Sequence, residues 1–223
     1  MKYRAIIFDF DGVIVDSEWL ANTVLGEALT ERGYPVTRDE ALDRYSGLRW
    51  DDCYRRIEEE SGLRFGRSNL GDPVDAAVAA RAAEMLAVEG VESFVASQTD
   101  RMLAIASSSE TWWLEQTLRR LGLSHAFGDR LYSAAGFARG KPHPDIYLHA
   151  ADRLGVPPEA CLVIEDHPVG VAAGAAAGMT VIALLAGRHI RHGHEERVRA
   201  AGASLIAHDY AQVFEIMEEL ERT

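Results

Sequence analysis

Short apolar runs alternate with amphipathic segments along most of the chain. The first run, "AIIF" at Ala5 to Phe8, is apolar at every position and rich in β-branched residues, which is typical of a strand covered on both faces. Comparable runs follow at residues 102–106, 130–133, 161–164, 180–184 and 204–206. Segments of helical periodicity lie between them, and several end at a glycine, as the one at residues 144–154 does at Gly155. This alternation predicts a parallel α/β sheet with helices on both faces.

The segment from about residue 17 to residue 87 interrupts the alternation directly after the first strand. Apolar residues at helical spacing predict a helix over 17–32, and further helices are expected up to residue 87 without a strand between them. Thr37 and Glu40 form a capping-box pair for the second of these helices. Asp72 is expected to cap the fourth, with Pro73 at its first helical position.

This interruption predicts two domains. Residues 1–16 and 88–223 would form the α/β core, and residues 17–87 would form an all-helical cap inserted after the first strand. A chain of 223 residues is long enough for such a core with an insert.

Composition narrows the classes of partner and compartment. The net charge is −12, from 23 basic and 35 acidic side chains, which disfavours nucleic acid or an anionic membrane as the main partner. The two cysteines, Cys53 and Cys161, are too few for a disulfide framework. With no signal-peptide pattern and no apolar stretch of bilayer length, we expect a cytoplasmic protein that does not enter a membrane.

Three of the predicted strands are followed directly by polar side chains. Asp9 comes after the first, Ser107 after the second, and the pair Glu165–Asp166 after the strand at 161–164. In open α/β sheets the ligand crevice lies at the carboxyl ends of the strands, so these loops are expected to meet there. Each residue also has a plain structural interpretation, since Ser107 or the acidic pair could cap the helix that follows.

The chemistry of this set favours a metal ion and a phosphoryl group. Together with Asp11, the set holds four carboxylates, which repel one another and favour a bound cation. Carboxylate oxygens suit a hard ion such as Mg²⁺, whereas thiolate and imidazole ligands typical of zinc are absent at these positions. A hydroxyl at Ser107 and the ammonium of Lys141 would complete a cradle for a phosphoryl group. Alone, Lys141 would be interpreted as a solvated loop lysine.

Four segments resemble the four motifs of the haloacid dehalogenase superfamily. They are "FDFDGVIVDSE" from residue 8, "IASSS" from residue 105, "GKPHPDIY" from residue 140 and "VIEDHPVGVAAGAAAGM" from residue 163. The resemblance covers residues 3 to about 186 and is greatest to the β-phosphoglucomutase-like and sugar-phosphatase branch. It implies a Rossmann-like core with a helical cap inserted after the first motif.

The resemblance implies a role for each matching residue. Asp9 would be the nucleophile that attacks phosphorus and becomes an aspartyl phosphate, and Asp11 would be the general acid and base. Ser107, Ser108 and Lys141 would hold the phosphoryl oxygens. The Mg²⁺ site would consist of Asp9, Asp11 through its backbone carbonyl, and Asp166 as direct ligands, with Glu165 acting near the ion through water. In the cap, Arg49 would approach a distal anionic group of the substrate, or would instead pair with Asp51 or Asp52.

The function expected from these residues is Mg²⁺-dependent hydrolysis of a small phosphorylated metabolite, such as a sugar phosphate or a related acid. The first alternative is a β-phosphoglucomutase-like isomerase, which is disfavoured because Ala21 stands where that subfamily carries a catalytic histidine. The second is a catalytically idle binding protein, which is disfavoured by the complete set of motif residues. A phosphonatase would need a cap lysine, and the chain has none between Lys2 and Lys141. A monomer would suffice for this mechanism.

Two histidine features remain outside the motifs. His167 follows the acidic pair and is expected to start the next helix ahead of Pro168. The tract "RHIRHGHEE" holds His189, His192 and His194, and we interpret it as a solvated loop rather than a metal site.

Overall fold

The computed structural model describes residues 2–46 and 50–222. It divides into two compact units. One contains the chain up to Val15 and from Ala87 onward, and the other is Asp16–Leu86.

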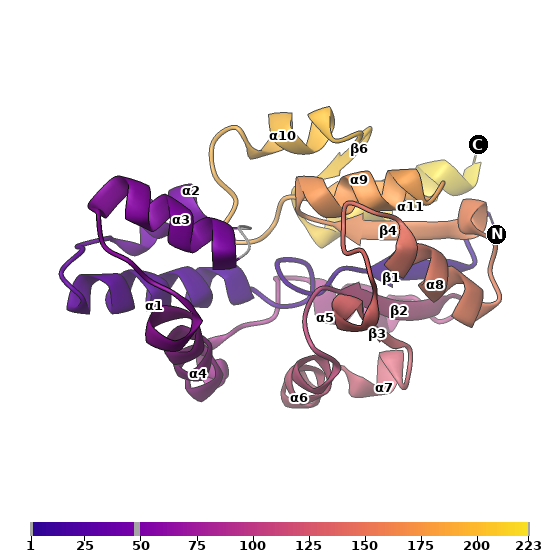
Figure 1. Cartoon of the computed structure of the whole chain (residues 1–223). Helices are drawn as coiled ribbons and strands as arrows, with labels where there is room; N and C mark the ends of the chain where they lie inside the picture. The colour runs from indigo at the N-terminus through magenta and orange to yellow at the C-terminus, as the bar shows by residue number, and fades with distance from the viewer. Residues whose placement is uncertain (1, 47–49, 223) are drawn as a thin grey trace. The chain divides into compact units, whose positions relative to one another are not determined.

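The first unit is built on a parallel sheet with strand order β3-β2-β1-β4-β5-β6 in the described part of the chain (Figure 1). The strands are β1 Ala5–Phe8, β2 Met102–Ser107, β3 Leu131–Ser133, β4 Cys161–Glu165, β5 Thr180–Leu184 and β6 Leu205–Ala207. β1 pairs with β2 on one side and with β4 on the other, Ala5 being opposite both Met102 and Cys161. All four residues of β1 are buried, as expected for a strand covered on both faces.

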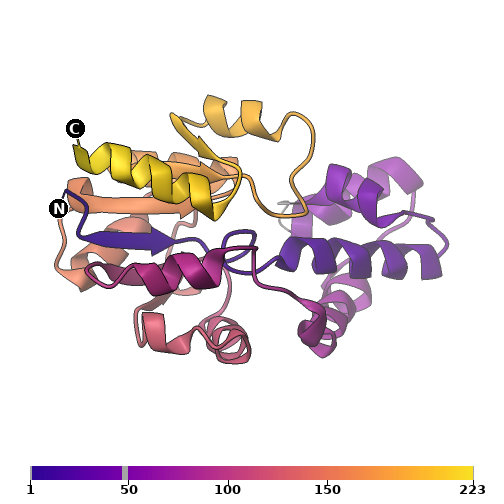
Figure 2. The same cartoon turned by 180° about the vertical axis from the view of Figure 1, so that it is seen from behind.

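Helices cover both faces of this sheet. In Figure 1, α8 (Asp145–Leu154) and α9 (Pro168–Ala176) lie in front of the sheet. In the reverse view of Figure 2, α5 (Val91–Ser97) and α11 (Tyr210–Arg222) lie in front of it. The remaining helices of this unit are α6 Thr111–Leu121, α7 Ser124–Phe127 and α10 His194–Ala200. The α/β architecture with helices on both faces is therefore confirmed.

The second unit is the inserted helical region that the interrupted alternation predicts. Its helices are α1 Ser17–Glu31, α2 Arg38–Tyr45, α3 Trp50–Ser61 and α4 Asp72–Ala80. The capping box of α2 is confirmed, because the Thr37 hydroxyl accepts from the Glu40 amide while the Glu40 carboxylate accepts from the Thr37 amide. The predicted start of α4 is wrong by one position. A π-helical turn at Arg67–Gly71 runs directly into it, so Asp72 has helical backbone angles and Gly71 is the N-cap.

No helix in the described residues is both long enough and apolar enough to cross a lipid bilayer.

One carboxylate joins the segment before the first strand of the core to the last helix. Glu221 of α11 accepts hydrogen bonds from the backbone amides of Lys2, at 2.7 Å, and Tyr3, at 3.3 Å. It also accepts one from the Arg101 guanidinium at 3.0 Å. Burial raises the pKa of Glu221, but these hydrogen bonds and the Arg101 charge outweigh burial, so its pKa is lowered overall.

We expect Glu221→Gln to lower the free energy of unfolding by about 1 kcal/mol at pH 7, after discounting a charged hydrogen bond for solvent screening. The folded-state pKa is depressed, so the carboxylate's contribution is fully present above the pKa of the unfolded chain and is lost as the pH falls through the folded-state pKa. Urea unfolding at pH 7 and below pH 4 measures this. An equal difference between variant and parent at both pH values would contradict the assignment.

Candidate active site

The predicted site lies where the direction of strand order changes. From the central strand β1 the chain adds β2 and β3 on one side, and then β4, β5 and β6 on the other. Asp9 follows β1 directly, and Glu165 is the last residue of the neighbouring strand β4. A crevice forms at such a switch point, outside the carboxyl ends of the strands. The topology therefore places these two carboxylates side by side although they are far apart in the sequence.

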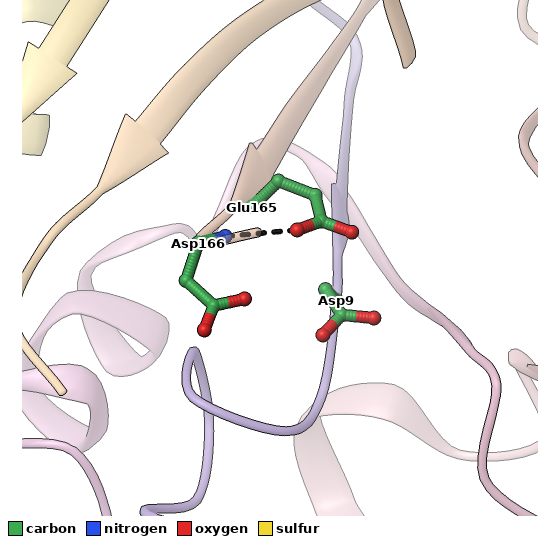
Figure 3. Close-up of side chains that lie close together, drawn as sticks. All are labelled: Asp9, Glu165 and Asp166. Carbon is green, nitrogen blue, oxygen red and sulfur yellow. Dashed lines mark hydrogen bonds between the residues drawn. The ribbon is translucent and has the colours of Figure 1, made fainter. Parts of the chain in front are cut away.

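Asp9, Glu165 and Asp166 form a compact acidic cluster, shown in Figure 3. Each of them offers one carboxylate oxygen, and these oxygens lie within 4.8 Å of one another. All three residues are buried, with exposed fractions of 8%, 1% and 3%. Burying ionised carboxylates is unfavourable unless cations or hydrogen-bond donors compensate their charge. The cluster is compensated by the positive charge of a lysine and by hydrogen-bond donors.

Lys141 supplies a positive charge between two of the carboxylates. Its Nζ atom donates to Oδ1 of Asp9 at 2.6 Å, to Oε1 of Glu165 at 2.7 Å and to the backbone oxygen of Ala106 at 3.1 Å. A lysine ammonium has three protons, so these three acceptors use its full donor capacity. Lys141 is thus a buried cation that fixes Asp9 and Glu165 in place, not the solvated lysine that its loop position alone would suggest.

The pKa shifts of the three carboxyl groups show that Lys141 compensates only part of their negative charge. Burial raises the pKa of Asp9 well above the usual range, and although Lys141 opposes this, the neighbouring carboxylates add to it. Burial likewise raises the pKa of Asp166. Burial also acts to raise the pKa of Glu165, but Lys141 outweighs it and the pKa is lowered. The cluster is therefore short of positive charge, and its oxygen donors fit a hard divalent cation.

Glu165 is held by hydrogen-bond donors that the sequence analysis did not assign to it. Its Oε2 atom accepts from the backbone amides of Asp166 and His167, both at 2.9 Å. The hydroxyl of Tyr147, a fully buried residue of α8, donates to Oε1 at 3.1 Å, and its ring lies 4.8 Å from Nζ of Lys141. Gly170 leaves room for this carboxylate, because a β-carbon there would overlap it. Tyr147 was visible in "GKPHPDIY", but only the fold shows its contact.

The hydroxyl groups at the end of β2 and just after it contact Asp11. Ser109 donates to Oδ2 of Asp11 at 2.6 Å, and Ser107 lies 3.5 Å from the same atom. The Ser107 hydroxyl also accepts from the backbone amide of Ser109 at 3.0 Å. Ser108, one of the predicted phosphate-binding residues, is exposed. Ser109 is therefore the contact that sequence reasoning missed, although "SSS" contained it.

The turn after Asp11 depends on a glycine. Gly12 has φ +83°, a left-handed conformation that L-residues with a side chain rarely adopt. A β-carbon at this position would also overlap the Asp166 carboxylate. The backbone amide of Gly12 donates to the carbonyl of Val15 at 2.7 Å, which closes the turn. Gly12 thus brings the loop that carries Asp11 into contact with the end of β4.

The expectation of a solvated histidine tract is wrong for two of its three members. His189 and His194 are each only 5% exposed, whereas His192 is exposed. Nε2 of His189 lies 2.8 Å from Oδ2 of Asp166, and Nε2 of His194 lies 2.6 Å from the backbone oxygen of Asp166. His194 is the first residue of helix α10 and is buried there.

The other two predicted residues are His167 and Arg49. His167 is the N-cap of α9, as expected, and its Nδ1 atom accepts from the Val169 amide at 3.3 Å. Arg49, the predicted specificity residue of the cap, lies outside the described residues.

Comparison with known proteins shows which family this chain belongs to. The sequence pattern of the haloacid dehalogenase-like hydrolases matches residues 6–184. Two curated relatives come from Escherichia coli K12. One is 6-phosphogluconate phosphatase, with 26% identity over 84% of this chain and 85% of the relative, and the other is hexitol phosphatase B, with 32% identity over 80% and 82%.

A solved structure agrees with this match over nearly the whole chain. A haloacid dehalogenase family hydrolase from Deinococcus radiodurans R1, with bound phosphate and sodium, superposes with a TM-score of 0.84. It shares 31% identity, and the match covers 98% of this chain and 96% of that one. The family pattern spans both strands that carry the acidic cluster, and the fold agrees with it, so this chain belongs to the haloacid dehalogenase-like hydrolases.

Proposed function

We propose that this protein is a phosphoric monoester hydrolase that acts on a small phosphorylated metabolite with the help of Mg²⁺. The observation that carries the proposal is the buried cluster of Asp9, Glu165 and Asp166, with Lys141 bound to Asp9, at the sheet's switch point. Membership of the haloacid dehalogenase-like hydrolases supports it. Two relatives are named as phosphatases, and a related structure binds phosphate.

Asp9 is the nucleophile in this proposal. Lys141 binds its Oδ1 atom and supplies the positive charge that favours the ionised form, so Oδ2 is the oxygen that attacks phosphorus. A new bond forms between Oδ2 and phosphorus while the bond from phosphorus to the substrate oxygen breaks. The products of this first step are an aspartyl phosphate and an alcohol.

Asp11 moves the protons. It donates a proton to the departing substrate oxygen, and it then accepts one from the water that attacks the aspartyl phosphate. That attack breaks the bond between phosphorus and Asp9 and releases inorganic phosphate. The hydrogen bond from Ser109 to Oδ2 of Asp11 orients the carboxyl group for both transfers. Ser107 and Ser108 are proposed to hold phosphoryl oxygens. Lys141 would bind a phosphoryl oxygen as well only when one of its ammonium protons leaves its protein acceptor.

The acidic cluster would hold the metal ion. The ligands in this proposal are Asp9, the backbone carbonyl of Asp11, Glu165 and Asp166, and their oxygen donors and unbalanced negative charge fit Mg²⁺. When bound, the ion neutralises negative charge on the phosphoryl oxygens and polarises the phosphorus centre.

The substrate class is proposed to be sugar phosphates or related acids. The relatives named for 6-phosphogluconate and for hexitol act, by their names, on phosphorylated sugar derivatives. Residues 17–87 are proposed to act as a cap that carries substrate specificity, with Arg49 directed to a distal anionic group. Transfer to water is favoured over return to the sugar, because Ala21 lacks an imidazole that could move a proton on the first cap helix.

Phosphate release from a panel of phosphorylated metabolites tests the proposal. We expect release with Mg²⁺ and none with a chelator, with sugar phosphates and sugar-acid phosphates ranked highest. A folded protein that releases no phosphate from any compound in the presence of Mg²⁺ would contradict it. A parallel assay with a hexose 1-phosphate and the corresponding bisphosphate detects isomerisation, which would favour the mutase instead.

A further inference from the structure

The His189 imidazole contacts the acidic cluster from outside the family motifs. Its Nε2 atom lies 2.8 Å from Oδ2 of Asp166, and the side chains are only 3% and 4% exposed. At this distance and burial the contact is a direct polar interaction shielded from water. His189 follows β5 and the family pattern ends at residue 184, so nothing in the four motifs assigns it a function.

The surrounding backbone is shaped to admit this imidazole. A β-carbon at Gly187 would meet its Cε1 and Nδ1 atoms, and a β-carbon at Gly12 would approach Cε1 as well. Gly12 also belongs to the turn that carries Asp11. The ring therefore fills a space between two glycines and one carboxylate, which leaves it little freedom to turn away from Asp166.

A second histidine holds the backbone of the same residue. Nε2 of His194 lies 2.6 Å from the carbonyl oxygen of Asp166, and the ring centroids of His189 and His194 are 6.1 Å apart. Nδ1 of His194 accepts from the Arg197 guanidinium at 3.0 Å, so its Nε2 carries the proton and donates to Asp166. The backbone of Asp166 is thus fixed independently of His189, and the imidazole of His189 acts on the carboxylate.

We propose that His189 is a positioning residue for Asp166. Through the close contact between its Nε2 atom and Oδ2 of Asp166, it would orient the carboxylate for the divalent metal ion. The proposal rests on the proposed function, in which Asp166 is a metal ligand. The partners that orient metal-ligating side chains typically change metal affinity by about 10–100-fold when they are removed. His189 is not itself placed in the ligand set, because the compact group of potential ligand atoms in the described residues comprises Asp9, Glu165 and Asp166.

Two amide variants test whether His189 orients the Asp166 carboxylate or only fills the space beside it. A glutamine side chain places its amide nitrogen at the distance of the histidine Nε2, whereas the shorter asparagine places its nitrogen nearer to Nδ1 and does not reach Asp166. We therefore expect His189→Asn and the apolar His189→Leu to weaken Mn²⁺ binding by about 10–100-fold, and His189→Gln to retain most of the affinity. His192→Asn, in the exposed histidine of the same tract, serves as the matched control and should bind as the parent does.

The readout is binding of Mn²⁺ to the purified full chain, followed by the electron paramagnetic resonance signal of the free ion. Thermal unfolding without metal shows that each variant is folded. In the phosphate-release assay, the Mg²⁺ concentration for half-maximal rate should rise in His189→Asn, while kcat at saturating Mg²⁺ stays close to that of the parent.

Asp166→Asn distinguishes failure of this inference from failure of the proposed function. If the parent binds Mn²⁺ and Asp166→Asn does not, the metal site stands. Parent-like binding by His189→Asn and His189→Leu would then overturn the role of His189 alone. Equal losses in His189→Asn and His189→Gln would also overturn it, since a donor at the Nε2 position would make no difference. A parent that binds no Mn²⁺ would overturn both proposals.

Discussion

Replacing Asp9 by asparagine is expected to abolish phosphate release. The amide has nearly the shape of the carboxylate but carries no charge and is a poor nucleophile, so the aspartyl phosphate cannot form. Removal of an enzyme's nucleophile commonly lowers kcat by several orders of magnitude, and we expect a loss of about 10⁴-fold or more. The measurement is the release of inorganic phosphate under saturating substrate and Mg²⁺.

The control for this variant is Asp152→Asn, in an exposed aspartate of α8. It makes the same chemical change on the same domain and should retain parental activity. Thermal unfolding verifies that Asp9→Asn is folded. A folded Asp9→Asn protein with more than a small residual activity would rule out Asp9 as the nucleophile, although the metal site could still be correct.

Replacing Lys141 by methionine is expected to destabilise the protein strongly as well as inactivate it. Methionine keeps much of the apolar volume but leaves the buried carboxylates of Asp9 and Glu165 without their cation. Removing one partner of a buried ion pair costs about 3–5 kcal/mol, because the remaining charge is left uncompensated. Urea unfolding at pH 7 in the presence of a chelator measures the loss of unfolding free energy.

The chain offers a matched control because its only other lysine is Lys2, which is exposed. Lys2→Met should leave the unfolding free energy within about 0.5 kcal/mol of the parent value, as is usual for exposed sites. If Lys141→Met were as stable as Lys2→Met, the two ion pairs of Lys141 would not contribute as the structure indicates. The full engagement of its ammonium protons would then have no energetic consequence.

The fold follows from patterns that are local in the sequence. The apolar run of β1 predicts a buried central strand because a strand covered on both faces needs apolar residues at every position. Thr37 and Glu40 predict the start of α2 because a capping box involves residues only three positions apart. Local patterns did not suffice at the start of α4, where Asp72 was predicted to be the N-cap. Its capping pattern was present, but the preceding helical turn at Arg67–Gly71 decided where α4 begins.

The acidic cluster was also predictable, through a rule about parallel sheets rather than through any contact. Asp9 and Glu165 both stand at the carboxyl end of an apolar run, and parallel strands bring such ends to one edge. The sequence could therefore indicate that these residues meet. It could not show that the Lys141 ammonium donates all three of its protons to protein acceptors, because that depends on the path of the loop before α8.

What the amino-acid sequence determined by itself is the order of strands and helices, the inserted helical region and the motif residues at the strand ends. Only the tertiary structure decided that Ser109 and not the exposed Ser108 binds Asp11, and that Tyr147 and His189 contact the acidic cluster. The physical reason is that hydrophobic periodicity and capping act between near neighbours in the chain. The partners of a buried polar group are instead set by which distant segments pack against it, and by glycines such as Gly12 and Gly170 that leave room for the contact.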